Sequence, residues 1–420
     1  MPLATGVKTA SPAAYAHTSL AVANLRGVFI LILVSFHASL AYLGSTAGPA
    51  AHFTQPPFQW LAFPVVDSRR FYGFDLYCAW EDVHVMALMF FLSGLFVPGS
   101  LRRKGAARFL ADRVLRLALP FLFSVLAVAP LALYPVFHGL HPHASIADYI
   151  GAYRSLPFLP NGPAWFLWLL LAISIAAGAL YAAAPATLDA LGRIAASARL
   201  RPQRFLLTLA AAATLAYVPL ALIFGPFPWL ERGPFSVQLS RPLLYLVYFF
   251  AGASVGAAGL GEGLLAPDGA LARNWRRLGA LSAATLFTWM GLTGVTLNAP
   301  AFAPMPMRAL SALAYVGASV AGVMLLMAIS TRFLAQRIRW LEPLSRNALG
   351  IFILHYAPLV WMQYLMLDAP LPAIVKASIV FAVALPLSLA LAVAMSRFGW
   401  LARLIGEDPR ATAPARIAKA

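Results

Sequence analysis

The sequence predicts an all-α integral membrane protein with about ten transmembrane helices. Of its 420 residues, 61% are hydrophobic and only 11% are charged, whereas soluble domains are about half apolar and about one quarter charged. Uncharged apolar runs of about 20 residues, the length at which a helix crosses a bilayer, recur along the whole chain. This composition excludes a soluble enzyme, a nucleic-acid-binding module and a secreted disulfide scaffold.

The first apolar run is predicted to be a retained span, because Met1 to Ala23 does not resemble a cleaved signal peptide. Each later run follows a polar connection, and no soluble-domain-sized insertion interrupts them. We therefore expect a cytoplasmic segment over 1–23, one membrane domain over 24–396 and a basic cytoplasmic tail over 397–420. The predicted spans are 24–44, 82–99, 114–136, 163–183, 205–225, 240–258, 278–297, 309–331, 347–367 and 372–396.

The basic residues predict the orientation of these spans. Lysine and arginine favour cytoplasmic loops close to span ends. With ten spans and a cytoplasmic amino terminus, 24 of the 31 basic residues fall inside and 7 fall outside. Both termini are therefore expected in the cytoplasm, and the net charge of +17 reflects membrane topology and anionic ligands rather than binding to nucleic acid.

Cysteine and histidine spacing gives little support for a metal or a disulfide. Cys78 is the single cysteine and has no internal partner. His138, His141 and His143 share a Pro-containing connection, but their spacing is weak evidence for a zinc site. We expect no metal.

Two histidines lie deep in predicted spans, where ionisable residues are costly and are candidates for function. They are His37 and His355, and a packed, hydrogen-bonded helix contact is the alternative role for each. Arg26 precedes His37 by eleven residues, three helical turns plus about 20°, so the two share a helix face about 16 Å apart. This register suggests an anion clamp at the inner face and a titratable group beyond the bilayer midplane.

The outer start of the second predicted span carries a polar cluster. Glu81, Asp82 and His84 lie together, and Glu81 and His84 share a helix face at i,i+3 spacing. The cluster is predicted to bind and polarise a ligand group or to raise the basicity of His37, with ordinary interfacial solvation as the alternative. The preceding outer connection, 44–79, is rich in aromatic residues and offers a plausible platform for a sugar, although aromatic girdles are common at membrane interfaces.

Several segments resemble the membrane-bound acyltransferase 3 family. Arg26 and His37 stand in NLRGVFILILVSFHASL, like the first span of that family, and MALMFFLSGLFV (86–97) resembles its second. FLADRVLRLALP (109–120), the tryptophan Trp165 in GPAWFLWLLL and the late FILHYAPL (352–359) are also similar. The resemblance covers nearly the whole chain, and the order of these motifs is more specific than any one of them.

The resemblance implies transfer of an acetyl or succinyl group from cytoplasmic acyl-CoA, as co-substrate, to a hydroxyl of a periplasmic or cell-surface glycan. A hydroxyl needs a base and imidazole titrates near neutral pH, so His37 is the expected general base, with Glu81 and Asp82 beside it in the catalytic set. Arg26, Arg113 and Arg116 are expected to bind the CoA phosphates. His84, Trp165 and His355 are expected to bind substrate.

The expected partners are acyl-CoA, a carbohydrate acceptor and membrane lipids in a bacterial inner membrane, with the oligomeric state open. The aromatic outer connection and WEDVHVMALMFFLSG are more similar to the glucan-biosynthesis protein C branch, which succinylates periplasmic glucans, than to the lipopolysaccharide O-acetyltransferases. Two alternatives remain: a transporter or flippase in which Arg26, His37 and His355 form a relay, and a lipid-linked glycosyltransferase using Asp67 and Asp75.

Overall fold

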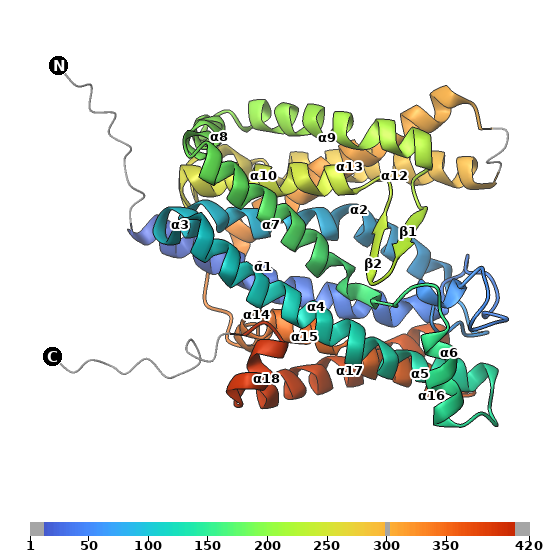
Figure 1. Ribbon diagram of the computed structural model, residues 1–420. Coiled ribbons are helices and arrows are strands. Elements are labelled where there is room, and N and C mark those ends of the chain that lie inside the picture. The colour runs from blue at the N-terminus through green and yellow to red at the C-terminus, as the bar shows by residue number, and fades with distance from the viewer. Residues whose placement is uncertain (1–11, 299–302, 408–420) are drawn as a thin grey trace, which may run out of the picture.

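Long helices dominate the protein. The computed structural model describes residues 12–298 and 303–407 (Figure 1). Within these residues, eight helical stretches are long and apolar enough to cross a membrane. They are α1 (Pro12–Ser39), α2 (Tyr72–Leu95), the run Val97–Leu140, α7 (Trp165–Ala183), α9 (Pro202–Phe224), α12 (Trp275–Asn298), α13 (Met305–Phe333) and α17 (Ala373–Ser396).

Two further helical segments account for the remaining predicted runs. The pair α15 (Ala348–Leu354) and α16 (Tyr356–Leu365) forms one apolar stretch bent by 44°, and α10 (Pro242–Ala258) is apolar but shorter than the others. Each of the ten predicted runs therefore falls on helix. The all-α membrane class is confirmed.

A proline explains the bend between α15 and α16. Pro358 has no backbone N–H for the carbonyl of Leu354, and its ring pushes that carbonyl aside. His355 lies at the break, where it is the C-cap residue of α15 and the N-cap residue of α16. The bend thus places a histidine where one helix direction changes into another.

Prolines also shape the third long stretch. It consists of α3 (Val97–Arg113), the π-helical turn η3 (Val114–Ala118), α4 (Leu119–Phe123), a second π-helical turn η4 (Ser124–Val128) and α5 (Ala129–Leu140). Pro120 and Pro130 follow the two turns and leave carbonyls inside them without their usual partners. Wide turns of this kind are frequent at functional sites, and these two carry Arg116 and Ser124.

Glycines bring α2 and α10 into backbone contact. A Cβ on Gly252 would lie 1.9 Å from the carbonyl oxygen of Phe91, and one on Gly256 would lie 1.9 Å from that of Leu95. Only glycine permits this approach, which is typical of small-xxx-small packing in membranes. The contact makes α2 and α10 a rigid pair.

Short elements connect the long helices. The strands β1 (Trp229–Arg232) and β2 (Phe235–Gln238) form an antiparallel hairpin with Trp229 opposite Gln238 and Arg232 opposite Phe235. The short helices are η1 (Leu40–Tyr42), η2 (Gln59–Leu61), α6 (Ile146–Arg154), η5 (Gly162–Ala164), α8 (Ala186–Ala196), η6 (Ser197–Arg199), η7 (Gly263–Leu265), α11 (Ala270–Arg273), α14 (Glu342–Arg346) and α18 (Gly399–Leu404).

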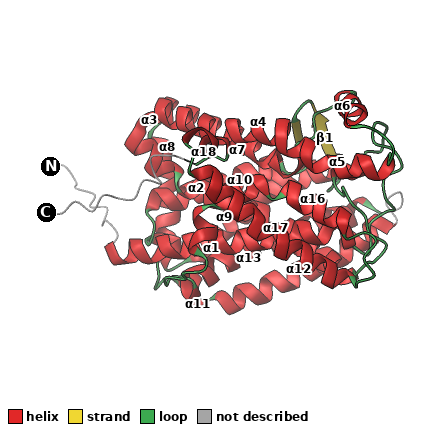
Figure 2. Cartoon of the chain, turned by 90° about the horizontal axis from the view of Figure 1, so that it is seen from below, coloured by secondary structure: helices red, strands yellow, loops and turns green. Residues whose placement is uncertain are grey.

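The connections gather at two opposite ends of the bundle. Figure 1 shows α3, α8, α18 and the start of α1 at one end, which we name the α3 end. The hairpin, α6 and the loop between α1 and α2 lie at the other, which we name the hairpin end, and Figure 2 shows the same separation from a second direction. The predicted inner and outer connections are thus separated as an even number of crossings requires.

Helix boundaries differ from the predicted spans at three places. Helix α1 begins at Pro12, inside the segment assigned to the cytoplasm, and α2 begins at Tyr72, inside the predicted outer connection. The basic inner connection 102–116 is helical in α3 and η3, apart from a break at Gly105, where φ is 72°. Hydropathy indicates where the membrane ends, whereas a helix continues beyond that point when its polar side chains find hydrogen-bond partners. In the first turn of α2, for example, the Asp75 carboxylate accepts hydrogen bonds from the backbone N–H groups of Gly44 and Ser45.

Candidate active site

The structure brings the two predicted membrane histidines together. The ring centroids of His37 on α1 and His355 at the α15–α16 break are 4.9 Å apart. His37 is partly exposed, whereas His355 is completely buried. The His37 side chain therefore keeps some exposed surface, whereas His355 packs beside it inside the bundle.

Hydrogen bonds fix the proton position on both rings. Nδ1 of His37 lies 2.9 Å from the carbonyl oxygen of Leu33, and Nδ1 of His355 lies 2.7 Å from that of Phe352. A carbonyl oxygen only accepts, so both Nδ1 atoms carry a proton and both Nε2 atoms keep a lone pair in the neutral rings. Nε2 of His355 is buried without a hydrogen-bond partner among the described residues.

A buried amide couples the two helices at this level. Gln363 of α16, 2% exposed, donates from Nε2 to the carbonyl oxygens of His37 at 2.9 Å and Ala38 at 3.3 Å. These carbonyls are available because α1 ends at Ser39. Gln363 thereby fixes α16, and with it His355, against the backbone of His37.

Three predicted arginines also gather, toward the α3 end. The charges of Arg26 and Arg116 are close enough to repel one another, as are those of Arg113 and Arg116. Arg26 and Arg116 are exposed, and the Arg113 guanidinium lies 5.1 Å from the centre of the Phe109 ring. We name this group the arginine cluster.

Neighbouring contacts set the depth and the charge of the arginine cluster. Asn24 donates to the carbonyls of Leu334 and Gln336, so Arg26 lies level with the end of α13. Two carboxyl groups act on the cluster. Asp112 interacts with Arg113 and is paired with Lys104. Burial raises the pKa of Glu407, and the charge of Arg116 partly opposes this rise. Positive charge remains in excess, which suits an anion.

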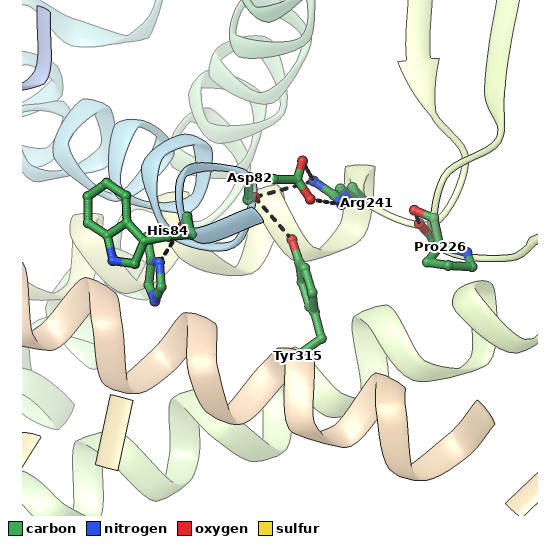
Figure 3. A network of polar contacts seen from close by, with 7 residues as sticks. Asp82, His84, Pro226, Arg241 and Tyr315 are labelled. Atoms are coloured by element: carbon green, nitrogen blue, oxygen red, sulfur yellow. Dashed lines mark hydrogen bonds and ion pairs between the residues drawn. The ribbon is translucent and has the colours of Figure 1, made fainter. Parts of the chain in front are cut away.

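The carboxylate of Asp82 has a structural partner. Arg241 donates from Nη1 to Oδ1 at 2.7 Å and from Nη2 to Oδ2 at 2.6 Å, and it is 1% exposed (Figure 3). The guanidinium also lies 5.1 Å from the centre of the Tyr315 ring. This bidentate pair joins α2, α10 and α13, so Asp82 is committed to packing, and its predicted catalytic role remains a prediction.

Glu81 and His84 occupy different surroundings. Glu81 is 3% exposed and feels the charges of Asp82 and Arg241, with no hydrogen bond to it recorded among the described residues. His84 is completely buried, donates from Nδ1 to the carbonyl of Trp80 at 2.5 Å, and packs against Gly322 of α13. Figure 3 shows its ring pointing away from the Asp82–Arg241 pair. Within the predicted outer cluster, Nε2 of His84 is also buried without a hydrogen-bond partner among the described residues, so both Glu81 and His84 keep unused hydrogen-bonding capacity.

Aromatic residues at the hairpin end divide into buried and accessible sets. Trp60 and Phe53 are stacked and buried, at 0% and 1% exposure, and they support the loop rather than offer a platform. Trp60 therefore does not belong to the predicted sugar platform. Trp165 is partly exposed. The centroid of its ring lies 5.5 Å from that of Trp229 in the hairpin and 5.9 Å from that of Tyr245 in α10.

A second buried ion pair secures the loop between α1 and α2. Lys376 Nζ lies 2.7 Å from Asp67 Oδ2, with both side chains 0% exposed, and donates to the carbonyl of Leu367 at 3.0 Å. The Asp67 backbone N–H donates to the carbonyl of Ala41 at 2.9 Å. These contacts tie the loop to η1 and α17, which makes Asp67 a structural residue.

Sequence reasoning missed Arg241, Lys376 and Gln363. The two cations belong to the seven basic residues that the positive-inside pattern assigns to the outer side, although their positions beside apolar runs could mark them as buried. The large cavity of about 510 Å³ at the α3 end, lined by His17, Arg199, Glu262 and Asp268, was also missed. Arg199 already pairs with both carboxylates there, and the cavity is not lined by the histidine pair or the arginine cluster.

The described residues contain no group of three or more His, Cys, Asp or Glu side chains that could hold a metal ion. The side chains gathered at the site offer imidazole, carboxyl, hydroxyl and guanidinium groups. A partly exposed imidazole with a free Nε2 can take a proton from a hydroxyl, and an excess of guanidinium charge can hold an anionic carrier.

Comparison with known proteins agrees with this chemistry. A sequence model of the acyltransferase domain family matches residues 20–397, which include every predicted site residue. No curated protein and no solved structure matches the chain. The match spans the whole helical bundle, and the chain belongs to the acyltransferase 3 family of membrane acyltransferases.

Proposed function

We propose that this acyltransferase moves an acetyl or succinyl group from cytoplasmic acyl-CoA to a hydroxyl of a periplasmic or cell-surface glycan, in the inner membrane of a bacterium. The observation that carries the proposal is the state of His37. Its Nδ1 proton is held by the Leu33 carbonyl, so Nε2 of this partly exposed side chain is the atom that accepts a proton.

In the proposed step, each proton and each bond that is broken or formed is accounted for within the site. Nε2 of His37 takes the proton of the acceptor hydroxyl as the oxygen attacks the thioester carbonyl carbon. The new C–O bond forms, the C–S bond breaks, and CoA leaves as a thiolate that takes the proton from the imidazolium. Positioned bases of this kind contribute about 10²- to 10⁴-fold to a rate.

His355 serves as a hydrogen-bond acceptor beside the base. Its Nε2 has a lone pair and is buried. The centroid of its ring lies 4.9 Å from the centroid of the His37 ring. A buried acceptor without a partner costs free energy until a ligand donor reaches it. The acceptor glycan, which is rich in hydroxyl groups, supplies such donors.

The arginine cluster binds the donor phosphates. CoA carries several phosphate charges, and Arg26 and Arg116 are exposed and repel one another without a ligand. An anion between them removes this repulsion and gains charge-assisted hydrogen bonds. The three turns of α1 between Arg26 and His37 give a distance of roughly 16 Å for the carrier arm to cross.

The hairpin end receives the acceptor. Glu81 supplies a carboxylate with free acceptor capacity, and Trp165 supplies a partly exposed ring on which a sugar can stack. The orientation predicted from basic residues puts this end in the periplasm. Donor and acceptor therefore enter from opposite sides and meet at His37.

Mass analysis of surface and periplasmic glycans tests the proposal, using cells with the wild-type protein, with His37→Gln and without the protein. Wild type should add one acyl mass to one glycan class, and His37→Gln should lose transfer by about 100-fold or more at equal membrane abundance. His141→Gln, in the outer connection, is the matched control and should keep wild-type transfer. Substantial transfer by His37→Gln would exclude the base assignment.

A further inference from the structure

A small cavity adjoins the histidine pair and has no assigned role. It has room for about one water-sized group, about 10 Å³, and lies between η4, η5 and α15–α16. Its wall includes Ser124, Val128, Ala164, Phe352 and Tyr356. Tyr356 directly follows His355, and the rings of Phe352 and His355 are 6.1 Å apart. A single side chain, Phe352, thus touches both the cavity and the histidine pair.

The lining of this cavity is neutral and contains one unused polar atom. Ser124 is 3% exposed, and its Oγ has no hydrogen-bond partner among the described residues. Asn161, also in the wall, is already bound, because its Nδ2 donates to the Pro234 carbonyl and its Oδ1 accepts from Ser236. No lysine, arginine, aspartate or glutamate is among the residues that line the cavity.

The π-helical turn η4 produces this arrangement. The turn places Ser124 and Val128 in one wall of the cavity, and α15 and η5 supply the opposite wall. Such turns persist at functional sites because they cost regular helix hydrogen bonds. A cavity with an unpartnered, buried hydroxyl, separated from His355 by the Phe352 ring, therefore has the properties of a ligand subsite.

We infer that this cavity receives the acyl group of the donor and selects a small uncharged one, acetyl, over succinyl. The inference rests on the proposed acyl-CoA reaction and decides between its two donors. The methyl of an acetyl group needs little more room than a water molecule, and Ser124 can donate a hydrogen bond to a carbonyl oxygen. Succinyl would bring one more carbon and a carboxylate, four more heavy atoms in all, into a neutral cavity, where an unpaired charge is strongly disfavoured.

Equilibrium binding to the full-length protein in detergent tests the inference without needing the acceptor. Isothermal titration would compare CoA, acetyl-CoA, propionyl-CoA and succinyl-CoA. We expect acetyl-CoA to bind at least about fourfold more tightly than CoA, the value of one buried methyl-sized group. Succinyl-CoA should bind no more tightly than CoA.

Variants of two valines provide a matched comparison. Val125 and Val128 are both buried on η4, but only Val128 lines the cavity. Val128→Ala should raise the affinity for propionyl-CoA relative to acetyl-CoA by about fourfold, whereas Val125→Ala should leave this ratio at the wild-type value. Ser124→Leu should fill the cavity and reduce acetyl-CoA affinity to that of CoA; elution as a monodisperse species shows that it folds.

The outcomes separate the inference from the proposed function. Equal binding of succinyl-CoA and acetyl-CoA, or equal effects of the two valine variants, would overturn the inference and leave a cavity that holds only water. Failure of CoA itself to bind the wild-type protein would overturn the acyl-CoA reaction as well. A preference for acetyl-CoA that Ser124→Leu abolishes would establish the subsite.

Discussion

Removing one charge from the arginine cluster should raise the stability of the protein and weaken its binding of the donor. Arg26→Gln and Arg116→Gln each remove one member of a repelling pair whose charges are exposed. Two unit charges 4 Å apart interact by about 1 kcal/mol in water and about 4 kcal/mol at a protein surface of lower effective dielectric. Because these side chains are exposed, we expect each variant to gain about 0.5–1 kcal/mol in unfolding free energy without ligand.

The same variants should bind the donor more weakly. Loss of a charge-assisted hydrogen bond costs about 1.5–3 kcal/mol, which is roughly a tenfold to a hundredfold loss of CoA affinity. Because both arginines act on one group of phosphates, the double variant should lose less affinity than the sum of the single losses. High salt should reduce the stability gain, since salt screens exposed charges.

Thermal unfolding in detergent and titration with CoA measure the two effects. Arg103→Gln is the control, because Arg103 is exposed on α3 outside the cluster and should change neither quantity by more than about 0.5 kcal/mol. Variants that are less stable than wild type and keep its CoA affinity would refute the reasoning. The arginines would then be structural or topological residues.

Two further predictions concern stability. Arg241→Met should lower the free energy of unfolding by about 3 kcal/mol, because it leaves the Asp82 carboxylate without its partner, and adding Asp82→Asn should restore part of this loss in thermal unfolding. Burial raises the pKa of Glu231 in β1 from 4.5 to about 7. The fold therefore favours the protonated acid, and the unfolding free energy of the wild type should fall as pH rises from about 4.5 to 7. Glu231→Gln should not show this fall. It should be about 1 kcal/mol more stable than the wild type at pH 8 and equally stable below pH 4.5. An unchanged unfolding temperature for Arg241→Met, or parallel pH profiles for Glu231→Gln and wild type, would contradict these expectations.

The sequence predicted the helical runs because hydropathy measures the property that a bilayer selects. Each of the ten runs lies on helix in the structure. Hydropathy does not show where a helix ends, since a polar turn continues a helix whenever it finds partners. The turns of α2 between Tyr72 and Ala79 and the basic helix α3 were therefore assigned to connections.

The pairing of charges could not be predicted from sequence position. Asp82 and Arg241 are 159 residues apart, and Asp67 and Lys376 are 309 apart. Before folding, all four are polar residues beside apolar runs. Their burial follows from tertiary packing, and it turns a predicted catalytic carboxylate, Asp82, into the partner of an arginine.

The register of Arg26 and His37 was predictable because one helix determines it. The proximity of His37 and His355 was not, because it depends on the bend that Pro358 produces and on the amide of Gln363. The Ser124 cavity also depends on a proline-induced change in helix register. Prolines are visible in the sequence, but the side chains that they bring together are not.

The distribution of paired and unpaired groups gives the strongest physical argument for where ligands bind. Toward the hairpin end, the costly buried cations Arg241 and Lys376 are each matched to a carboxylate at 2.6–2.7 Å. Toward the α3 end, the arginine cluster keeps excess charge, and midway between them the buried Nε2 of His355 lacks a partner. Other buried polar atoms also lack hydrogen-bond partners, among them Nε of Arg241 and Nε2 of His84, so what distinguishes these groups is the excess positive charge of the arginine cluster and the position of His355 beside His37. Anionic and hydroxyl-bearing ligands would supply the missing partners, and they are the two substrate types that acyl transfer from CoA to a glycan requires.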